Sequence, residues 1–104
     1  MNVYKKVNKN VLSIVLESRD LETERDKLVE EFHDAMDMRE EREISLKLRD
    51  IRELPSNFGV VFLSFLEFLK TQDIPVNMEL ESGLMDILME LNLGEYVHSI
   101  QVLA

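Results

Sequence analysis

The chain has 104 residues, of which 45% are hydrophobic, 21 are acidic and 12 are basic, and it contains no cysteine. This length suits one domain with a modest core, and the lack of cysteine excludes disulfides, thiolate metal sites and a cysteine nucleophile. The net charge of −9 disfavours nonspecific binding to nucleic acid and to anionic membranes, and it permits a basic protein partner, whose encounter it would speed.

Residues 3–40 are predicted to form one long charged helix, because neither Pro nor Gly interrupts them and apolar residues recur every seven positions. This seam consists of Val7, Ile14, Leu21, Leu28 and Ala35. The companion seam is mixed, since it contains Ser18 and Arg25. The pattern therefore fits two arrangements equally: a coiled coil that pairs two chains, and a long helix that packs on its own domain.

Residues 40–54 fit two patterns. One set of apolar residues recurs at helical spacing, namely Ile44, Leu48 and Ile51. Another set alternates as in a strand, namely Ile44, Leu46 and Leu48. The alternation fails at Asp50, and the abundance of Arg, Glu, Lys and Leu favours a helix. We therefore predict a helix, continuous with the first or offset by a kink near residue 40, so that residues 1–54 form a helical arm.

The most apolar stretch is residues 58–69, which holds four of the five phenylalanines and lies between turn signals at Pro55 and Pro75. We predict a helix here that is apolar on all sides except at Ser64 and Glu67. Such a helix is buried, and its length of about 18 Å is too short to span a bilayer. We expect the other helices to cover it, and a second copy or a partner to do so where they cannot.

Residues 77–91 and 95–102 are predicted to form the last two helices, because Asn77 can cap the first and Gly94 separates the two. The predicted fold is thus all-α, with four or five helices in a single domain. The coiled-coil-like N-terminal helix packs with a compact helical cluster, residues 55–104, around a buried central helix.

The predicted function is noncatalytic: the chain binds a protein partner and regulates or inhibits it. Small acidic regulators and inhibitors, including accessory proteins of phages and bacteria, have this physical character. The sequence contains no G-x-S-x-G motif, no S-x-x-K motif and no glycine-rich phosphate loop, so we expect no enzyme and no cofactor. We expect a soluble, cytoplasmic homodimer that binds neither nucleic acid nor membranes directly.

Two sets of residues are predicted to bind partners. The apolar seam would join two copies through Val7, Ile14, Leu21 and Leu28. The acidic flank would face a basic or nucleic-acid-handling protein through Asp34, Asp37, Glu40, Glu41 and Glu43. Met36 and Met38 stand on the same charged stretch, so at least one of them is expected to be partly exposed or to contact a partner.

Two further functions fit the sequence less well. Both histidines follow a glutamate by three residues, as Glu30–His33 and Glu95–His98, and di-iron carboxylate bundles use pairs with this spacing. In a chain this rich in Glu such spacing also arises by chance, so we expect no metal site. The acidic run could instead imitate a nucleic-acid backbone, as an anti-defence protein of a phage would, although the interleaved Arg39 and Arg42 favour a solvated helix face.

Overall fold

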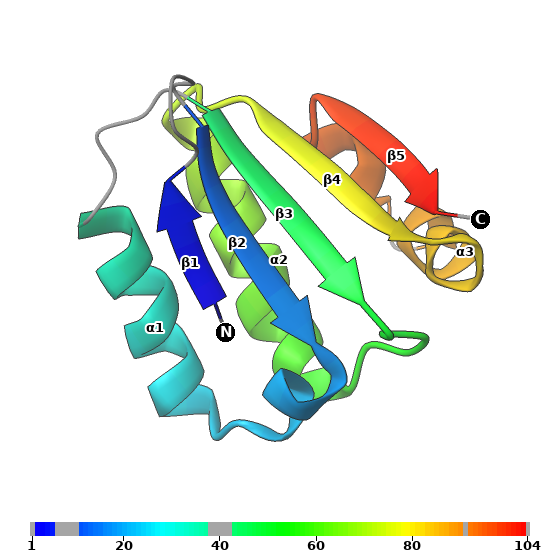
Figure 1. Cartoon of the computed structure of the whole chain (residues 1–104), viewed down its shortest axis with the longest axis horizontal. Coiled ribbons are helices and arrows are strands. Elements are labelled where there is room, and N and C mark those ends of the chain that lie inside the picture. The colour runs from blue at the N-terminus through cyan, green and yellow to red at the C-terminus, as the bar shows by residue number, and fades with distance from the viewer. Residues whose placement is uncertain (1, 6–10, 38–42, 91, 104) are drawn as a thin grey trace.

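The structure is a computed structural model and describes residues 2–5, 11–37, 43–90 and 92–103. These residues form one sheet with α-helices packed against it (Figure 1). The strands are β1 (Asn2–Lys5), β2 (Val11–Glu17), β3 (Glu43–Arg49), β4 (Val76–Glu81) and β5 (Ser99–Leu103). The helices are α1 (Arg25–Asp37), α2 (Ser56–Thr71) and α3 (Ser82–Glu90), with short 3-10 helices η1 (Ser18–Glu22) and η2 (Leu93–Tyr96).

The sheet has the order β1-β2-β3-β4-β5, in which β1 is antiparallel to β2 and all other neighbours are parallel. Each parallel step passes through a helix: α1 joins β2 to β3, α2 joins β3 to β4, and α3 joins β4 to β5. Because such crossovers are right-handed and all three step in the same direction, the helices lie on one face of the sheet. Figure 1 views the opposite face, with α2 and α3 behind the strands.

The prediction of an all-α, coiled-coil fold is therefore wrong, since the chain is a mixed α/β protein. The predicted helix over residues 3–40 contains two strands, and α1 begins only at Arg25. Five consecutive residues of β2, Leu12 to Leu16, are buried, as expected of a strand inside a largely parallel sheet. The residues that recur every seven positions therefore belong to different elements and do not form one helical face: Ile14 belongs to β2, and Leu28 belongs to α1.

Residues 43–49 form a strand, so the prediction of a helix over residues 40–54 is wrong and the alternating pattern was the correct one. Ile44, Leu46 and Leu48 turn toward the core. The strand stops before Asp50, whose φ of 55° places it in the left-handed region. The predicted arm of residues 1–54 is not a separate helical unit, because its strands share one sheet with β4 and β5.

The helix predicted over residues 58–69 is confirmed as part of α2. Beyond it, residues 76–81 form β4, where buried and partly buried residues alternate with a period of two. The helix predicted over residues 77–91 is thus limited to α3, which starts at Ser82. The helix predicted over residues 95–102 is replaced by the end of η2 and the edge strand β5.

The core lies between the sheet and the helical layer. Its largest fully buried side chains on α2 include Phe58, Phe62, Leu66 and Leu69. The rings of Phe32 on α1 and Phe65 on α2 stack with their centroids 4.3 Å apart, so the two helices are joined side by side. Within the described part of the chain, no helix combines the length and the apolar character that crossing a membrane requires.

The sheet face opposite the helices carries a row of polar residues, one from each strand in register, from β1 to β5: Tyr4, Ser13, Ser45, Asn77 and Ser99. Asn77 accepts a hydrogen bond of 2.6 Å from the Ser99 hydroxyl. Lys47 on β3 donates to the Tyr4 hydroxyl on β1 at 3.2 Å, so this contact crosses over β2 and ties down the short edge strand.

Candidate functional site

A groove of about 490 Å³ runs between α1 and α2 on the helical side of the protein. Its floor consists of lining residues that are almost fully buried: Phe32, Val61, Phe65 and Ile74. The stacked rings of Phe32 and Phe65 set the spacing of the two helices at the bottom of the groove. Both helices follow parallel strands, so they run in the same direction and their first turns lie at the same end of the groove.

The edges of the groove are apolar and open to solvent. Val29 on α1 is 48% exposed, and Val60 and Phe68 on α2 are 54% and 46% exposed. Met36, which is half-buried, also lines the groove. The other large exposed apolar residues of the described chain, Tyr4, Met89 and Val102, do not line it. A contiguous exposed apolar surface of this kind is typical of a binding site.

The exposed stripe on α2 arises from its sequence. Residues 60, 64 and 68 are four apart, so Val60, Ser64 and Phe68 share the side of the helix that faces the groove. The core side of α2 is fully used, because Phe58, Phe62, Leu66 and Leu69 occupy it. The sheet and α1 therefore leave part of the apolar surface of α2 uncovered, at Val60 and Phe68.

Charged residues mark the two ends of the groove. Arg25 begins α1 and Asp37 ends it, and both line the groove about 18 Å apart along the helix axis. The amino-terminal ends of α1 and α2 add partial positive charge near Arg25, and their carboxyl-terminal ends add partial negative charge near Asp37. The groove is thus positive at one end, apolar in the middle and negative at the other end.

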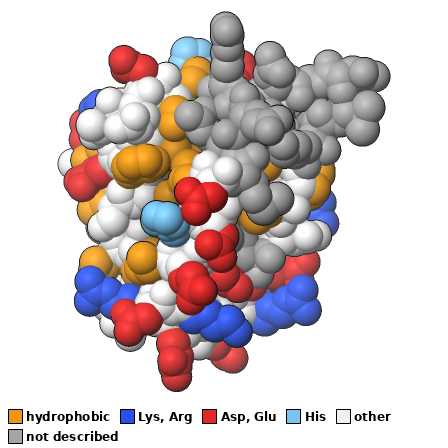
Figure 2. Space-filling view, turned by 90° about the vertical axis from the view of Figure 1, so that its left-hand side faces the viewer, with side chains coloured by type: hydrophobic (Ala, Val, Ile, Leu, Met, Phe, Trp, Pro, Cys, Tyr) orange, Lys and Arg blue, Asp and Glu red, His pale blue; other side chains and the backbone are white. Residues whose placement is uncertain are grey.

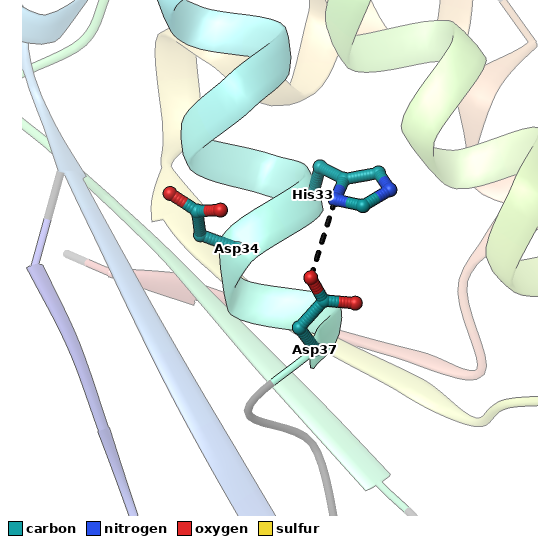
Figure 3. Close-up of side chains that lie close together, drawn as sticks. All are labelled: His33, Asp34 and Asp37. Carbon is teal, nitrogen blue, oxygen red and sulfur yellow. Dashed lines mark ion pairs between the residues drawn. The ribbon is translucent and has the colours of Figure 1, made fainter.

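Near the negative end, the Nδ1 atom of His33 lies 3.4 Å from Oδ2 of Asp37, and both side chains are exposed. Figure 3 shows the two side chains turned toward each other across one helical turn, with Asp34 standing to one side. One ligand atom from each of the three residues falls within 4.8 Å of the others, which makes this the one possible metal-ligand group in the described part of the chain. All three are exposed, and exposed groups of this kind are common on helices without an ion.

The structure does not bring together the two predicted Glu-His pairs. Glu30 and His33 lie on α1, whereas Glu95 belongs to η2 and His98 directly precedes β5. Figure 1 places α1 and β5 on opposite sides of the molecule. The metal-ligand group of the described chain includes His33 but neither Glu95 nor His98, so the helical spacing in the sequence does not produce a shared site.

The residues predicted to pair two copies have mostly internal positions. Ile14 and Leu28 are 0% and 1% exposed and belong to the core, and Leu21 packs against it. Val7 lies outside the described residues. These side chains are occupied by contacts within the chain, so we place any contact between copies elsewhere.

The predicted acidic flank is divided among several elements. Asp34 and Asp37 are exposed at the end of α1, while Glu40, Glu41 and Met38 lie outside the described residues. Glu43 begins β3 and accepts a hydrogen bond from the side-chain amide of Asn77 at 3.3 Å. Of the three acids in this set that the structure describes, Asp37 lines the groove and Asp34 and Glu43 do not.

Val60 and Phe68 were not predicted as surface residues, because residues 58–69 were expected to be buried on all sides, and Val29 of α1 was not predicted as a site residue either. The sequence contained one signal for Val29: it is apolar, yet it does not belong to the predicted seam that contains Leu28 and Ala35. Figure 2 shows the α1 side of the molecule, where hydrophobic side chains lie beside a histidine and carboxylates stand next to them.

Comparison with known proteins adds no further information about the site. The sequence matches no protein-family model. It also has no significant match among curated proteins. The candidate site therefore rests on the groove itself.

Proposed function

We propose that the protein is a noncatalytic interaction module, acting in the cytoplasm, that binds a protein partner in the α1–α2 groove and thereby regulates that partner. The observation that carries the proposal is the groove of about 490 Å³, whose apolar edges Val29, Val60 and Phe68 are each about half exposed. Grooves between two helices take amphipathic helices, which insert apolar side chains spaced three and four residues apart.

The charges of α1 indicate the chemistry of the partner. The helix contains Asp26, Glu30, Glu31, Asp34 and Asp37 against two bases, Arg25 and Lys27. Together with the net charge of −9, this surface attracts a helix whose polar side is basic and raises the rate of encounter. We therefore expect an amphipathic helix with apolar residues toward Phe68 and Val60 and with Lys or Arg along its edges.

Photo-crosslinking in the cells that make the protein tests this function directly. A photoreactive phenylalanine analogue replaces Phe68 in the groove, and in a matched control it replaces Met89, which is 63% exposed on α3. We expect a covalent adduct with a second protein from position 68 and none of the same mass from position 89. Equal adducts at both positions, or no adduct with another protein at position 68, would contradict the proposal.

The captured protein is then purified and its binding is measured by isothermal titration calorimetry. Phe68→Asp places a charge in the apolar groove and is expected to weaken binding at least about tenfold, because the residue lies between the two helices. Met89→Asp adds the same charge at a more exposed site and is expected to leave the affinity unchanged.

A further inference from the structure

We propose that, in the absence of a partner, the α1–α2 groove is covered by the same surface of a second copy of the chain, related by a two-fold axis. This inference rests on the proposed function, since it concerns the same groove and adds its regulation. Self-association and partner binding would then exclude each other, so the free concentration of the protein sets how many grooves are open.

The arrangement of charge in the groove is self-complementary. A two-fold interface requires that each contact between residues i and j is repeated as a contact between j and i. When α1 lies antiparallel to α1 of the second copy, Arg25 of each chain meets Asp37 of the other, so two ion pairs form about 18 Å apart. The positive ends of the helices face the negative ends at the same time.

The apolar residues of the groove lie between these two charged ends. Val29, Val60 and Phe68 are 48%, 54% and 46% exposed, and the antiparallel pairing buries them against each other. A dry apolar centre with charged residues at its rim is the usual anatomy of a protein interface. The antiparallel register places Val29 of one copy beside His33 of the other, since both lie equally far from the midpoint of α1.

The other acids of α1 lie on two different sides of the helix. Asp34 is exposed and does not line the groove, and Glu31 lies on the opposite side of α1 from Val29. Asp26 and Glu30 do not line the groove, but their spacing places them on the same edge of α1 as Asp37, so their charges weaken the pairing. Asp37 lies 3.4 Å from His33 of its own chain, yet its side chain is 71% exposed and remains open to Arg25 of a second copy. The net charge of −9 on each copy acts over longer distances and is screened by salt.

Charge reversal at the two ends tests the pairing by sedimentation equilibrium. We expect the wild-type protein to form a dimer whose fraction rises with concentration. Arg25→Asp places two like-charged pairs in the interface, as does Asp37→Arg, and each variant is expected to dimerise at least about tenfold more weakly. An equimolar mixture of the two variants restores both opposite-charge pairs, so it is expected to form the heterodimer with an affinity close to that of the wild type.

Asp86→Arg is the matched control, because it makes the same change of charge at an exposed position of α3, which does not line the groove, and it is expected to preserve the dimer. Far-ultraviolet circular dichroism verifies that every variant is folded. A wild type that stays monomeric at all concentrations, a mixture that stays monomeric, or an Asp86→Arg variant that loses the dimer would each overturn the inference. The proposed function has its own test in the Phe68 crosslink to another protein, so either proposal can fail while the other stands.

Discussion

Truncation of two phenylalanines, Phe32 and Phe68, separates the floor of the groove from its binding edge. Phe32 is 3% exposed and its ring stacks on Phe65 with centroids 4.3 Å apart. Phe32→Ala removes this buried ring and leaves a cavity, so it is expected to lower the free energy of unfolding by about 3–5 kcal/mol. Phe68 is 46% exposed, so Phe68→Ala removes only about half as much buried apolar surface as truncation of a fully buried phenylalanine. It is expected to lower the free energy of unfolding by about 1 kcal/mol.

The difference is large compared with the whole stability of a domain of this size, which is typically about 5–15 kcal/mol. For a chain of about 100 residues each kcal/mol shifts the Tm by about 4–8 °C, so Phe32→Ala is expected to lower the Tm by at least about 12 °C and Phe68→Ala by less than about 10 °C. Urea denaturation followed by circular dichroism measures both free energies under the same conditions. Equal losses in the two variants, or a larger loss for Phe68→Ala, would refute the assignment of Phe32 to the core and Phe68 to the surface.

Three further predictions test Tyr96 of η2, the edge strand β1 and the backbone at the end of β3. Partial burial and the carboxylates of Glu67 and Glu95 raise the pKa of Tyr96 above its usual value of about 10. The contribution of Tyr96 to stability is therefore full below about pH 10 and is lost as pH rises through the raised pKa. Tyr4→Phe leaves Tyr96 as the one tyrosine of the chain. In that background Glu67→Gln should lower the pH midpoint at which tyrosinate absorbance appears, and an unchanged midpoint would count against Glu67 as a cause of the raised pKa. Lys47→Ala removes the hydrogen bond to Tyr4 across β2 and is expected to lower the free energy of unfolding by less than about 1 kcal/mol. Hydrogen exchange of the β1 amides is expected to become faster, and equal exchange rates in the two proteins would show that this contact does not hold the strand. Asp50→Val forces a β-branched residue to a φ of 55° and is expected to lower the free energy of unfolding by about 1–2 kcal/mol. Asn tolerates this region of φ, so Asp50→Asn is expected to unfold within about 0.5 kcal/mol of the wild type in the same urea titration.

The sequence by itself determined the helix around residues 58–69, because an apolar run between Pro55 and Pro75 has both the length and the ends of a helix. The prediction that this helix is buried on all sides holds for its core residues but not for Val60 and Phe68, which are 54% and 46% exposed. The alternation of Ile44, Leu46 and Leu48 contained the signal for β3, although composition favoured a helix.

Only the tertiary structure decided which class of fold the chain adopts. The run from Val11 to Leu16 is apolar at every position except Ser13, and such a run fits a buried helix or a strand of a parallel sheet equally well. Its partner β3 lies more than twenty-five residues away, so local periodicity carries no information about that pairing. The sequence did not predict the groove either, because its two edges come from separate helices, α1 and α2, which only the pairing of the strands brings side by side.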